Sequence, residues 1–436
     1  MRNLLTFKSI WMLLEFSVGN YLSFKKIKTL SLVAAPITEF KEAATVKSAA
    51  HTLLKGAIIY GANSSGKSNF IRAMSTMRRL VLSSVEQSSS RELKISPFLL
   101  STVTSDKPSH FEIVFQEKDT RFRYGFEVTN TLVNSEWLYE AKSGREKPLF
   151  LREKDGIDVK NLFIEGKDLE AKTRDNALFL SVVDQFNGET ARRIIKWFNN
   201  FIAISGLQHE AYEFITFHML SNKKTAKPLM DFYRTLDLGF DTISSERILF
   251  DTKKLPNDIP ESLLKLMVSD LEGSHRFIFK TRHPKFDDKN NQVGYHEFDL
   301  RQDESAGTNK IFNLSGPIFD VLADGGVLIV DELDASLHPI LTLAITRLFN
   351  SSNHNPKNAQ LIFATHDANL LSKGEFRRDQ IFFIEKDKYG ASDLYSLIEL
   401  REEDGTKIRK DRSFEKDYVE GRYGAIPYIG NLQTLS

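Results

Sequence analysis

The pattern of apolar and polar residues changes along the chain, and this change predicts two kinds of β-sheet. Up to about residue 300, strand-like segments are rich in Phe, Val and Tyr and are separated by charged turns, as in antiparallel sheets. From Ser305 onward, short and wholly apolar runs alternate with segments of helical periodicity. Such runs are typical of parallel strands that helices cover on both faces. The predicted fold class is therefore α/β, with antiparallel β-structure in addition.

The antiparallel part is predicted to contain three groups of strands. The first is a hairpin-like pair around Gly19-Asn20, the second is a β-meander, and the third is a hairpin around a polar turn. Residues 140–180 are charged and mixed, and they carry no clear strand pattern. The predicted strands are 13–18 and 29–33, then Phe111–Phe115, Phe122–Val128 and Leu132–Tyr139, then Phe277–Thr281 and Tyr295–Leu300.

Apolar residues at helical spacing predict six helices. The last two helices are predicted to alternate with three buried strands, which makes the end of the chain the centre of a parallel sheet. The helices are Lys67–Leu82, Glu189–Ile204, Pro228–Leu236, Pro260–Leu271, Asn309–Ala323 and Ile340–Asn350, and the strands are Val327–Val330, Leu361–Ala364 and Ile381–Ile384.

The segment Gly61–Ser68 (GANSSGKS) fits the phosphate-binding pattern G-x-x-x-x-G-K-[ST]. It follows the apolar run 57–60 and precedes the first predicted helix, which is the strand–loop–helix context that the motif requires. Gly61 and Gly66 allow the backbone to approach phosphate closely, and the amides between them form an anion-binding nest. Lys67 would reach the β- and γ-phosphates, and Ser68 would offer a hydroxyl to Mg²⁺. The sequence therefore predicts binding of ATP and Mg²⁺.

Two buried strands in the second half of the chain end in residues suited to nucleotide hydrolysis. Val327–Val330 runs into Asp331-Glu332, where Asp331 would hold Mg²⁺ and Glu332 would act as the general base. Leu361–Ala364 runs into His366, which would contact the γ-phosphate. The alternatives are a solvated strand end and a structural histidine. Ligands bind at the carboxyl ends of strands in open α/β sheets, which favours the functional interpretation.

The segment Glu304–Thr308 (ESAGT) precedes a predicted helix, and its serine and small residues suit anion binding at a helix start. Because the P-loop already serves one nucleotide, a second phosphate-binding helix start needs a second nucleotide. A two-fold dimer, in which Ser305 and Gly307 face the γ-phosphate of the other subunit, would supply it. The alternative is an ordinary helix N-cap.

The composition limits which binding partners and which cellular compartment are expected for this protein. The 436 residues carry a net charge of +1, so no global electrostatic attraction to nucleic acid or anionic membranes is expected. The chain has no cysteine, which excludes disulfides and thiolate chemistry and is compatible with a reducing cytoplasm. No apolar run approaches the roughly 20 residues of a membrane span, so no membrane contact is expected. The N-terminus lacks a signal-peptide pattern, and Met12 opens a cleaner strand than Met1 does.

The order of these motifs resembles that of ABC-type ATPase heads. Within that superfamily, DELDASLHP (331–339) and FATHD (363–367) resemble the OLD-like (AAA15) branch. The closing GRYGAIP (421–427) resembles the AbiLi/RloA ATPases, which are associated with phage defence. The signature SAGT departs from the LSGGQ of transporters, and both Gln116 and Gln185 stay open as candidates for the Q-loop.

The resemblance implies an ABC-type P-loop NTPase head, that is, a mixed or parallel sheet with helices on both faces, plus the β-meander and an inserted α-helical region. It also implies a role for each residue that matches a motif. Gly61, Asn63, Ser65, Gly66, Lys67 and Ser68 bind ATP and Mg²⁺, Ser305 and Gly307 complete the partner subunit's site, Asp331 and Glu332 serve Mg²⁺ and hydrolysis, Asp334 serves the dimer contact, and His366 contacts the γ-phosphate.

Four regions are predicted. Residues 1–94 and 301–400 form the ATPase core, 95–300 are an insert for recognising a partner or trigger, and 401–436 are a tail. About 70 residues follow His366, which is too few for a nuclease domain, so a separate effector is expected. The resemblance implies a TOPRIM- or RloB-like partner, an ATP-dependent homodimer or higher oligomer, and a defence role.

An alternative is a DNA-maintenance ATPase of the RecF or SMC-head type that binds DNA directly. Basic residues on the first helix (Arg72, Arg78, Arg79) and near the end of the chain (Lys407, Arg409, Lys410, Arg412) would then contact phosphates, although solvated surfaces explain such residues more often. The neutral net charge and the lack of a long coiled coil argue mildly against this alternative.

Overall fold

A computed structural model describes residues 11–48, 50–86, 88, 90–142, 144–249, 275–372, 374–402 and 404–427. These residues form two compact units. The first unit comprises the residues up to Leu207 and those from Asp320 onward, and the second comprises Gln208–Phe319. None of the described helices is long and apolar enough to cross a membrane.

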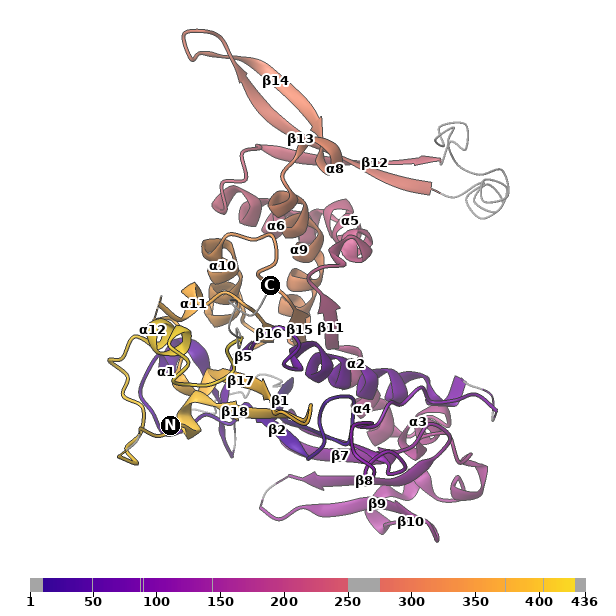
Figure 1. Ribbon diagram of the computed structural model, residues 1–436. Coiled ribbons are helices and arrows are strands. Elements are labelled where there is room, and N and C mark those ends of the chain that lie inside the picture. Colours follow the sequence, from indigo (N-terminus) through magenta and orange to yellow (C-terminus); the bar gives the residue numbers. More distant parts are fainter. Residues whose placement is uncertain are drawn as a thin grey trace, which may run out of the picture. The chain divides into compact units, whose positions relative to one another are not determined.

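The first unit contains a six-stranded sheet in the order β11-β15-β16-β5-β17-β18 (Figure 1). Every neighbouring pair is parallel except β17 and β18, which are antiparallel. The predicted buried strands at 327–330, 361–364 and 381–384 are thereby confirmed. The strands are β11 (Phe201–Ser205), β15 (Val327–Asp331), β16 (Gln360–Ala364), β5 (Gly56–Tyr60), β17 (Ile381–Lys386) and β18 (Ser392–Ser396).

The predicted helix Glu189–Ile204 is wrong in its second part. Helix α4 (Glu189–Asn199) ends before strand β11, which pairs in parallel with β15, so that Ala203 lies opposite Ile329. The run Phe201–Ile204 is apolar and too short for its periodicity to separate helix from strand. The run forms a strand because pairing with β15 gives hydrogen-bond partners to backbone groups that would otherwise be buried without them.

An antiparallel sheet of seven strands, in the order β10-β9-β8-β7-β6-β1-β2, makes up much of the rest of this unit (Figure 1). The predicted hairpin-like pair and β-meander are confirmed, while β9 and β10 fall in the segment that carried no clear pattern. Strand β1 lies between β2 and β6, which follows about ninety residues later. The strands are β1 (Trp11–Gly19), β2 (Lys28–Ser31), β6 (Ser109–Glu117), β7 (Thr120–Val128), β8 (Val133–Ala141), β9 (Lys147–Glu153) and β10 (Gly156–Val159).

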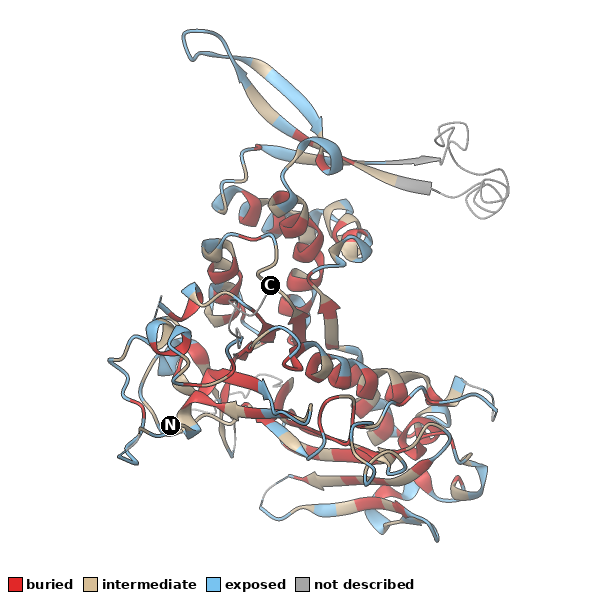
Figure 2. Ribbon diagram, in the orientation of Figure 1, coloured by how far each residue is buried: buried red, intermediate tan, exposed pale blue. Residues whose placement is uncertain are grey.

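Helix α2 (Lys67–Ser83) contributes to a core that joins the two sheets of this unit. Phe70 of α2 contacts Phe16 of β1 and Phe24 edge-on, each at 5.6 Å between ring centroids. The predicted helix 67–82 is therefore confirmed, and Figure 2 shows its buried residues in red. The remaining elements of the unit are α1 (Lys41–Ala44), β3 (Thr45–Lys47), β4 (Thr52–Leu54), α3 (Phe179–Gln185), α10 (Pro339–Asn350), α11 (Asn369–Ser372) and α12 (Phe414–Val419).

The second unit combines helices with a three-stranded antiparallel sheet, β12-β13-β14. The predicted hairpin is confirmed with longer strands, and the predicted helix Pro260–Leu271 lies outside the described residues. The predicted helix at Pro228 begins earlier, because Asn222 caps it by accepting the Lys224 N–H at 3.0 Å. The elements are α5 (Glu213–Ser221), α6 (Lys223–Thr235), β12 (Thr242–Leu249), β13 (His275–Phe286), β14 (Gln292–Asp299), α8 (Leu300–Asp303) and α9 (Ala306–Asp324), of which α9 continues into the first unit.

Helix α9 tolerates an internal proline because a side chain from α5 repairs its hydrogen bonds. Pro317 has no N–H, so the ladder breaks near Gly316. The Thr216 hydroxyl donates to the Phe312 carbonyl at 3.0 Å and accepts the Gly316 N–H at 3.0 Å. A Cβ on Gly316 would lie 2.5 Å from Thr216 Oγ1, so only glycine permits this insertion.

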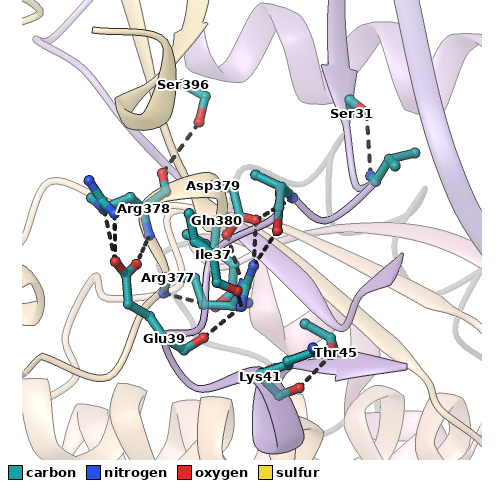
Figure 3. Close-up of polar contacts among 12 residues, drawn as sticks. Ser31, Ile37, Glu39, Lys41, Thr45, Arg377, Arg378, Asp379, Gln380 and Ser396 are labelled. Carbon is teal, nitrogen blue, oxygen red and sulfur yellow. Dashed lines mark hydrogen bonds and ion pairs between the residues drawn. The ribbon is translucent and has the colours of Figure 1, made fainter. Parts of the chain in front are cut away.

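A buried ion pair fastens the segment after β2 to the start of β17 (Figure 3). The Arg377 side chain is only 1% exposed and donates to both carboxylate oxygens of Asp379 at 2.9 and 2.8 Å. Its remaining donors reach the carbonyls of Ala35, Ile37 and Glu39, and Asp379 also accepts the Ala35 N–H. Each nitrogen of the guanidinium thus donates hydrogen bonds, which offsets the cost of burying its charge.

Replacing Asp379 with alanine should destabilise the protein by about 3–5 kcal/mol, because Arg377 would stay buried without its counter-charge. Urea unfolding followed by circular dichroism measures the loss. The matched control is Asp411→Ala, which removes an exposed carboxylate that pairs with Arg409 and should leave the unfolding midpoint unchanged. Equal midpoints for the two variants would contradict this account of the buried pair.

Candidate functional site

The predicted P-loop, the two strand ends and one further lysine line a single pocket at the carboxyl edge of the central sheet. The pocket has a volume of about 480 Å³. Because β15, β16, β5 and β17 are adjacent and parallel, the loops that follow them meet at this edge. The lining residues are Ala62, Asn63, Ser64, Ser65, Gly66, Lys67, Ser68, Asn69, Glu332, His366 and Lys386.

Both glycines of the P-loop occupy positions that other residues would strain. Gly66 has φ +119°, in the region that favours glycine, and a Cβ there would lie 2.3 Å from Ser392 Oγ. A Cβ on Gly61 would lie 2.4 Å from the Ile384 carbonyl oxygen and 2.6 Å from Ser65 Oγ. The loop therefore presses against the backbone of β17, and this contact gives the turn its shape.

A group of serines behind the P-loop holds it in place, and no pattern in the sequence predicts this group. The Ser392 hydroxyl, at the start of β18, donates to the Ser65 carbonyl at 2.6 Å, and its oxygen lies 2.8 Å from Ser23 Oγ, within hydrogen-bond distance. Asn69 also donates to Ser23 Oγ, at 2.9 Å. Since Ser23 and Ser392 are 369 residues apart, only the fold reveals that they act on one loop.

Lys67 is buried at the floor of the pocket and folds back on its own loop. Its ammonium donates to the Gly61 carbonyl at 2.6 Å and to the Ala62 carbonyl at 3.2 Å. Burial lowers the pKa of Lys67 to about 8, although the nearby Asp331, Glu332 and Asp334 oppose this shift. An anionic ligand in the pocket would favour the charged form and would replace these carbonyls as the partner.

His366 lies next to Lys67, with 3.4 Å between His366 Nδ1 and the Lys67 ammonium nitrogen. Burial and the Lys67 charge lower the pKa of His366, and the Asp334 carboxylate opposes them. The imidazole is therefore neutral near pH 7. The Asp334 carboxylate also accepts the backbone N–H of His366 at 3.2 Å, which ties the loop after β15 to the loop after β16.

The carboxylate of Asp331, at the end of β15 and just before the lining residue Glu332, is suited to Mg²⁺. Asp331 Oδ1 is buried and has no hydrogen-bond partner among the described residues, which is costly for a carboxylate unless a cation or water satisfies it. The described residues contain no cluster of three His, Asp or Glu side chains that would hold a metal alone. Mg²⁺ commonly binds through one or two protein ligands together with substrate phosphates. Asp331 and Ser68 are the ligands predicted from the sequence.

Glu332 has an unusual backbone conformation, with φ +53° in the left-handed region. A glutamate in this region costs free energy of about 1 kcal/mol or more, and such strain tends to be kept where it orients a functional side chain. The Asp331 carbonyl just before it accepts the Gly206 N–H at 2.7 Å. The turn after β15 is thus fixed by the neighbouring strand β11, whose existence the sequence did not indicate.

The structure brings together most residues that the sequence singled out. Gly61, Asn63, Ser65, Gly66, Lys67, Ser68, Asp331, Glu332 and His366 all belong to this edge of the first unit. Ser305 and Gly307 belong to the second unit, and their contact with a nucleotide stays a prediction. Ser305 is exposed, and its hydroxyl accepts the Thr308 N–H at 3.1 Å, as an N-cap does. Gln116 and Gln185 are not among the lining residues.

Lys386 and Asn69 line the pocket but were not predicted. Lys386 ends strand β17, and nothing in its sequence neighbourhood marks it as a phosphate ligand. In contrast, several basic residues named as possible nucleic-acid contacts are bound within the protein. Arg78 and Arg79 donate to the carbonyls of Phe198 and Leu93, and Arg412 pairs with Asp417.

Residues 57–372 match the family model described as "AAA domain, putative AbiEii toxin, Type IV TA system". No curated protein matches the chain. Solved structures with a related backbone include the SMC head domain from Thermotoga maritima, at 14% identity and a TM-score of 0.40, with 88% of this chain and 98% of that chain covered. An SmcHead bound to the C-winged helix domain of ScpA has 16% identity, a TM-score of 0.43, and 91% and 99% coverage. The recombination mediator RecF with ATPrS has 13% identity, a TM-score of 0.35, and 89% and 99% coverage.

Lys386→Gln removes a cation from the pocket wall, so it should weaken ATP binding about two- to fivefold and reduce the salt dependence of binding. Titration with a fluorescent ATP analogue at two salt concentrations measures both effects. The matched control is Lys388→Gln, two residues further along, where the ammonium lies 5.1 Å from the Tyr389 ring centre. If both variants bind ATP as the unmodified protein does, Lys386 is no ligand.

Proposed function

Since the chain belongs to the AAA-domain family whose description includes the AbiEii toxin and type IV toxin–antitoxin systems, we propose that it binds ATP with Mg²⁺ and hydrolyses the γ-phosphate. The fold is that of an ABC-type P-loop head, with a largely parallel sheet and additional antiparallel sheets. One observation carries the proposal. Lys67 begins helix α2 after β5, Glu332 and His366 follow β15 and β16, and all three line one pocket beside these neighbouring strands.

Binding would begin with the P-loop amides and Lys67. The Lys67 ammonium, now held by the carbonyls of Gly61 and Ala62, would turn to the β- and γ-phosphates. Because these carbonyls are neutral and the phosphates are anionic, the exchange favours the nucleotide. Asp331 and Ser68 would hold Mg²⁺, which neutralises charge on the phosphate oxygens.

Hydrolysis would depend on the two loops across from the P-loop. Glu332 would accept a proton from the attacking water, and its carboxylate is placed by the constrained turn after β15. His366 is neutral near pH 7, so one ring nitrogen can accept a hydrogen bond while the other donates one to the γ-phosphate. The hydrogen bond from the His366 N–H to Asp334 would keep the loops that carry Glu332 and His366 in a fixed relative position.

We further propose that two copies close around two ATP molecules. The N-terminus of α9 carries Ser305 and Gly307, and Ser305 is exposed. A helix start of this kind suits the γ-phosphate of a second copy, since the P-loop already serves the phosphates of the first. Asp334 would take part in the dimer contact, and higher oligomers would build on this dimer.

The proposed biological role is that of a regulatory subunit in an abortive-infection or toxin–antitoxin system. Support comes from the wording of the family description and from the GRYGAIP resemblance to phage-defence ATPases. Closure around ATP would control a separately encoded, nuclease-like effector of the TOPRIM or RloB type. The insert between the halves of the core is the proposed contact region, because nucleotide chemistry does not require it.

Glu332→Gln should lower steady-state phosphate release about a hundredfold or more and leave ATP binding intact, because only the general base is lost. With ATP and Mg²⁺ this variant should elute as a dimer in size-exclusion chromatography with light scattering. Lys67→Ala should bind no ATP and stay monomeric. Undiminished hydrolysis in Glu332→Gln would rule out the assigned base.

Ser305→Arg, placed in the Glu332→Gln background, should prevent the ATP-dependent dimer while each subunit still binds ATP. The matched control is Ser352→Arg, which changes another exposed serine and should dimerise normally. A dimer that survives Ser305→Arg would refute the proposed trans contact. Direct, ATP-dependent and strongly salt-dependent binding of duplex DNA would instead favour a DNA-maintenance ATPase.

A further inference from the structure

A second pocket of the first unit, here called the α2 pocket, shares no residue with the candidate nucleotide pocket. Its volume of about 560 Å³ is similar to the 480 Å³ of the nucleotide pocket. Arg72, its first lining residue on α2, follows Asn69 of the nucleotide pocket by three positions, so about one helical turn separates the two sites along α2. The lining residues are Tyr21, Leu22, Arg72, Thr76, Arg79, Ser83, Glu86, Arg91, Glu92, Lys94 and Ser96.

Hydrogen bonds between distant segments fix the walls of the α2 pocket. The Tyr21 hydroxyl lies 2.9 Å from Thr76 Oγ1, which joins the residues after β1 to α2. The Leu22 N–H donates to the Ser96 carbonyl at 2.9 Å, which joins the same residues to the segment 91–96. The pocket is therefore preformed, as sites for small molecules usually are. The α2 wall is one face of the helix, with lining residues at intervals of three or four: Arg72, Thr76, Arg79 and Ser83.

Positive charge gathers in this pocket, which has four cationic side chains and two carboxylates, in a chain whose net charge is only +1. Three of the cations, Arg72, Arg91 and Lys94, form no ion pair and no side-chain hydrogen bond with any residue that the structure describes. The Glu92 carboxylate instead accepts a hydrogen bond from Asn130 Nδ2 at 2.7 Å. An anionic ligand would supply the partner that these cations do not have within the described fold.

Arg79 is the fourth cation, and it is partly withdrawn from solvent. Its Nη2 donates to the Leu93 carbonyl at 3.1 Å, and burial lowers the pKa of Arg79 while the nearby Tyr21 opposes this shift. A guanidinium that is partly shielded from water interacts more strongly with an anion than an exposed one does. Its planar set of N–H donors matches phosphate oxygens, and a phosphate monoester offers three such oxygens to several cations at once.

The remaining lining groups indicate what the ligand carries besides phosphate. The hydroxyls of Ser83 and Ser96 and the two carboxylates can accept hydrogen bonds from the hydroxyl or amino groups of a sugar or base. A volume of about 560 Å³ lies within the range of small-molecule sites. A nucleic-acid strand needs a basic surface that extends over several phosphates, and the neighbouring Arg78 donates to the Phe198 carbonyl instead.

We propose that the α2 pocket binds a free phosphorylated small molecule, whose phosphate is held by Arg72, Arg79, Arg91 and Lys94. A phosphate joined to a polyhydroxylated sugar is the chemistry that fits, and nucleotides and sugar phosphates share it. The ligand would contact the helix that begins at the P-loop lysine, Lys67. Because the two pockets have no residue in common, the inference does not rest on the proposed function.

The test uses the full-length Lys67→Ala protein, in which the P-loop has lost its lysine, so that binding to the α2 pocket is measured separately. AMP and ribose 5-phosphate are the probes in isothermal titration calorimetry, and adenosine and ribose are the comparators without phosphate. At least one probe should bind with a Kd of about 0.01–1 mM, and the comparators should not bind. Binding of AMP alone would identify a nucleotide site, and equal binding of ribose 5-phosphate would identify a site for sugar phosphates.

Arg72→Gln combined with Lys94→Gln should weaken binding of the probe about tenfold or more, because two charge-assisted hydrogen bonds to phosphate are lost. The matched control, Lys223→Gln combined with Lys224→Gln, removes the same charge from exposed positions of α6 and should leave the Kd unchanged. Equal melting temperatures of the two double variants would show that the loss is not caused by unfolding.

The inference is overturned if neither probe binds, or if the two double variants bind the probe equally well. A single-stranded oligonucleotide that displaces the probe and binds more tightly than it does would assign the pocket to nucleic acid, and would also overturn the inference. ATP binding by the unmodified protein is measured separately, so the proposed function stands or fails independently of these results.

Discussion

The close approach of the P-loop to strand β17 at Gly61 is the constraint on which the candidate site depends. A side chain there would collide with the Ile384 carbonyl and with Ser65 Oγ, so the loop can follow this path only with glycine. The path in turn places the Lys67 ammonium beside His366 and turns the Ser65 carbonyl toward Ser392. The glycine at this position thus lets the P-loop contact both the loop after β16 and the start of β18.

The charged groups at the pocket do not satisfy one another fully, and a bound ligand would complete their interactions. Lys67 is buried with a lowered pKa, although three carboxylates favour its charged form, and Asp331 has a buried oxygen without a hydrogen-bond partner among the described residues. A triphosphate with Mg²⁺ carries both signs of charge and would satisfy the two sides together. This complementarity is the physical basis for assigning the pocket to a nucleotide.

Contacts far apart in sequence hold the frame of the site. The buried side chain of Gln360, at the start of β16, accepts the Leu13 N–H at 2.6 Å and donates to the carbonyls of Leu13 and Leu54. It thereby joins the antiparallel sheet to the central one. Arg377 and Asp379 do the same for the segment after β2. The polar groups of these side chains are buried and hydrogen-bonded, so the sheets must keep the one arrangement that satisfies them.

The sequence by itself determined the elements whose signal is local: the P-loop between a strand and a helix, the wholly apolar strands at 327–330 and 361–364, and the polar residues that follow them. It also indicated the β-meander. Only the tertiary structure decided that Phe201–Ser205 is a strand, since its pairing with β15 is not encoded in its periodicity. Tertiary structure alone likewise brought Lys386 and Ser392 to the P-loop, because these contacts join residues that are far apart along the chain.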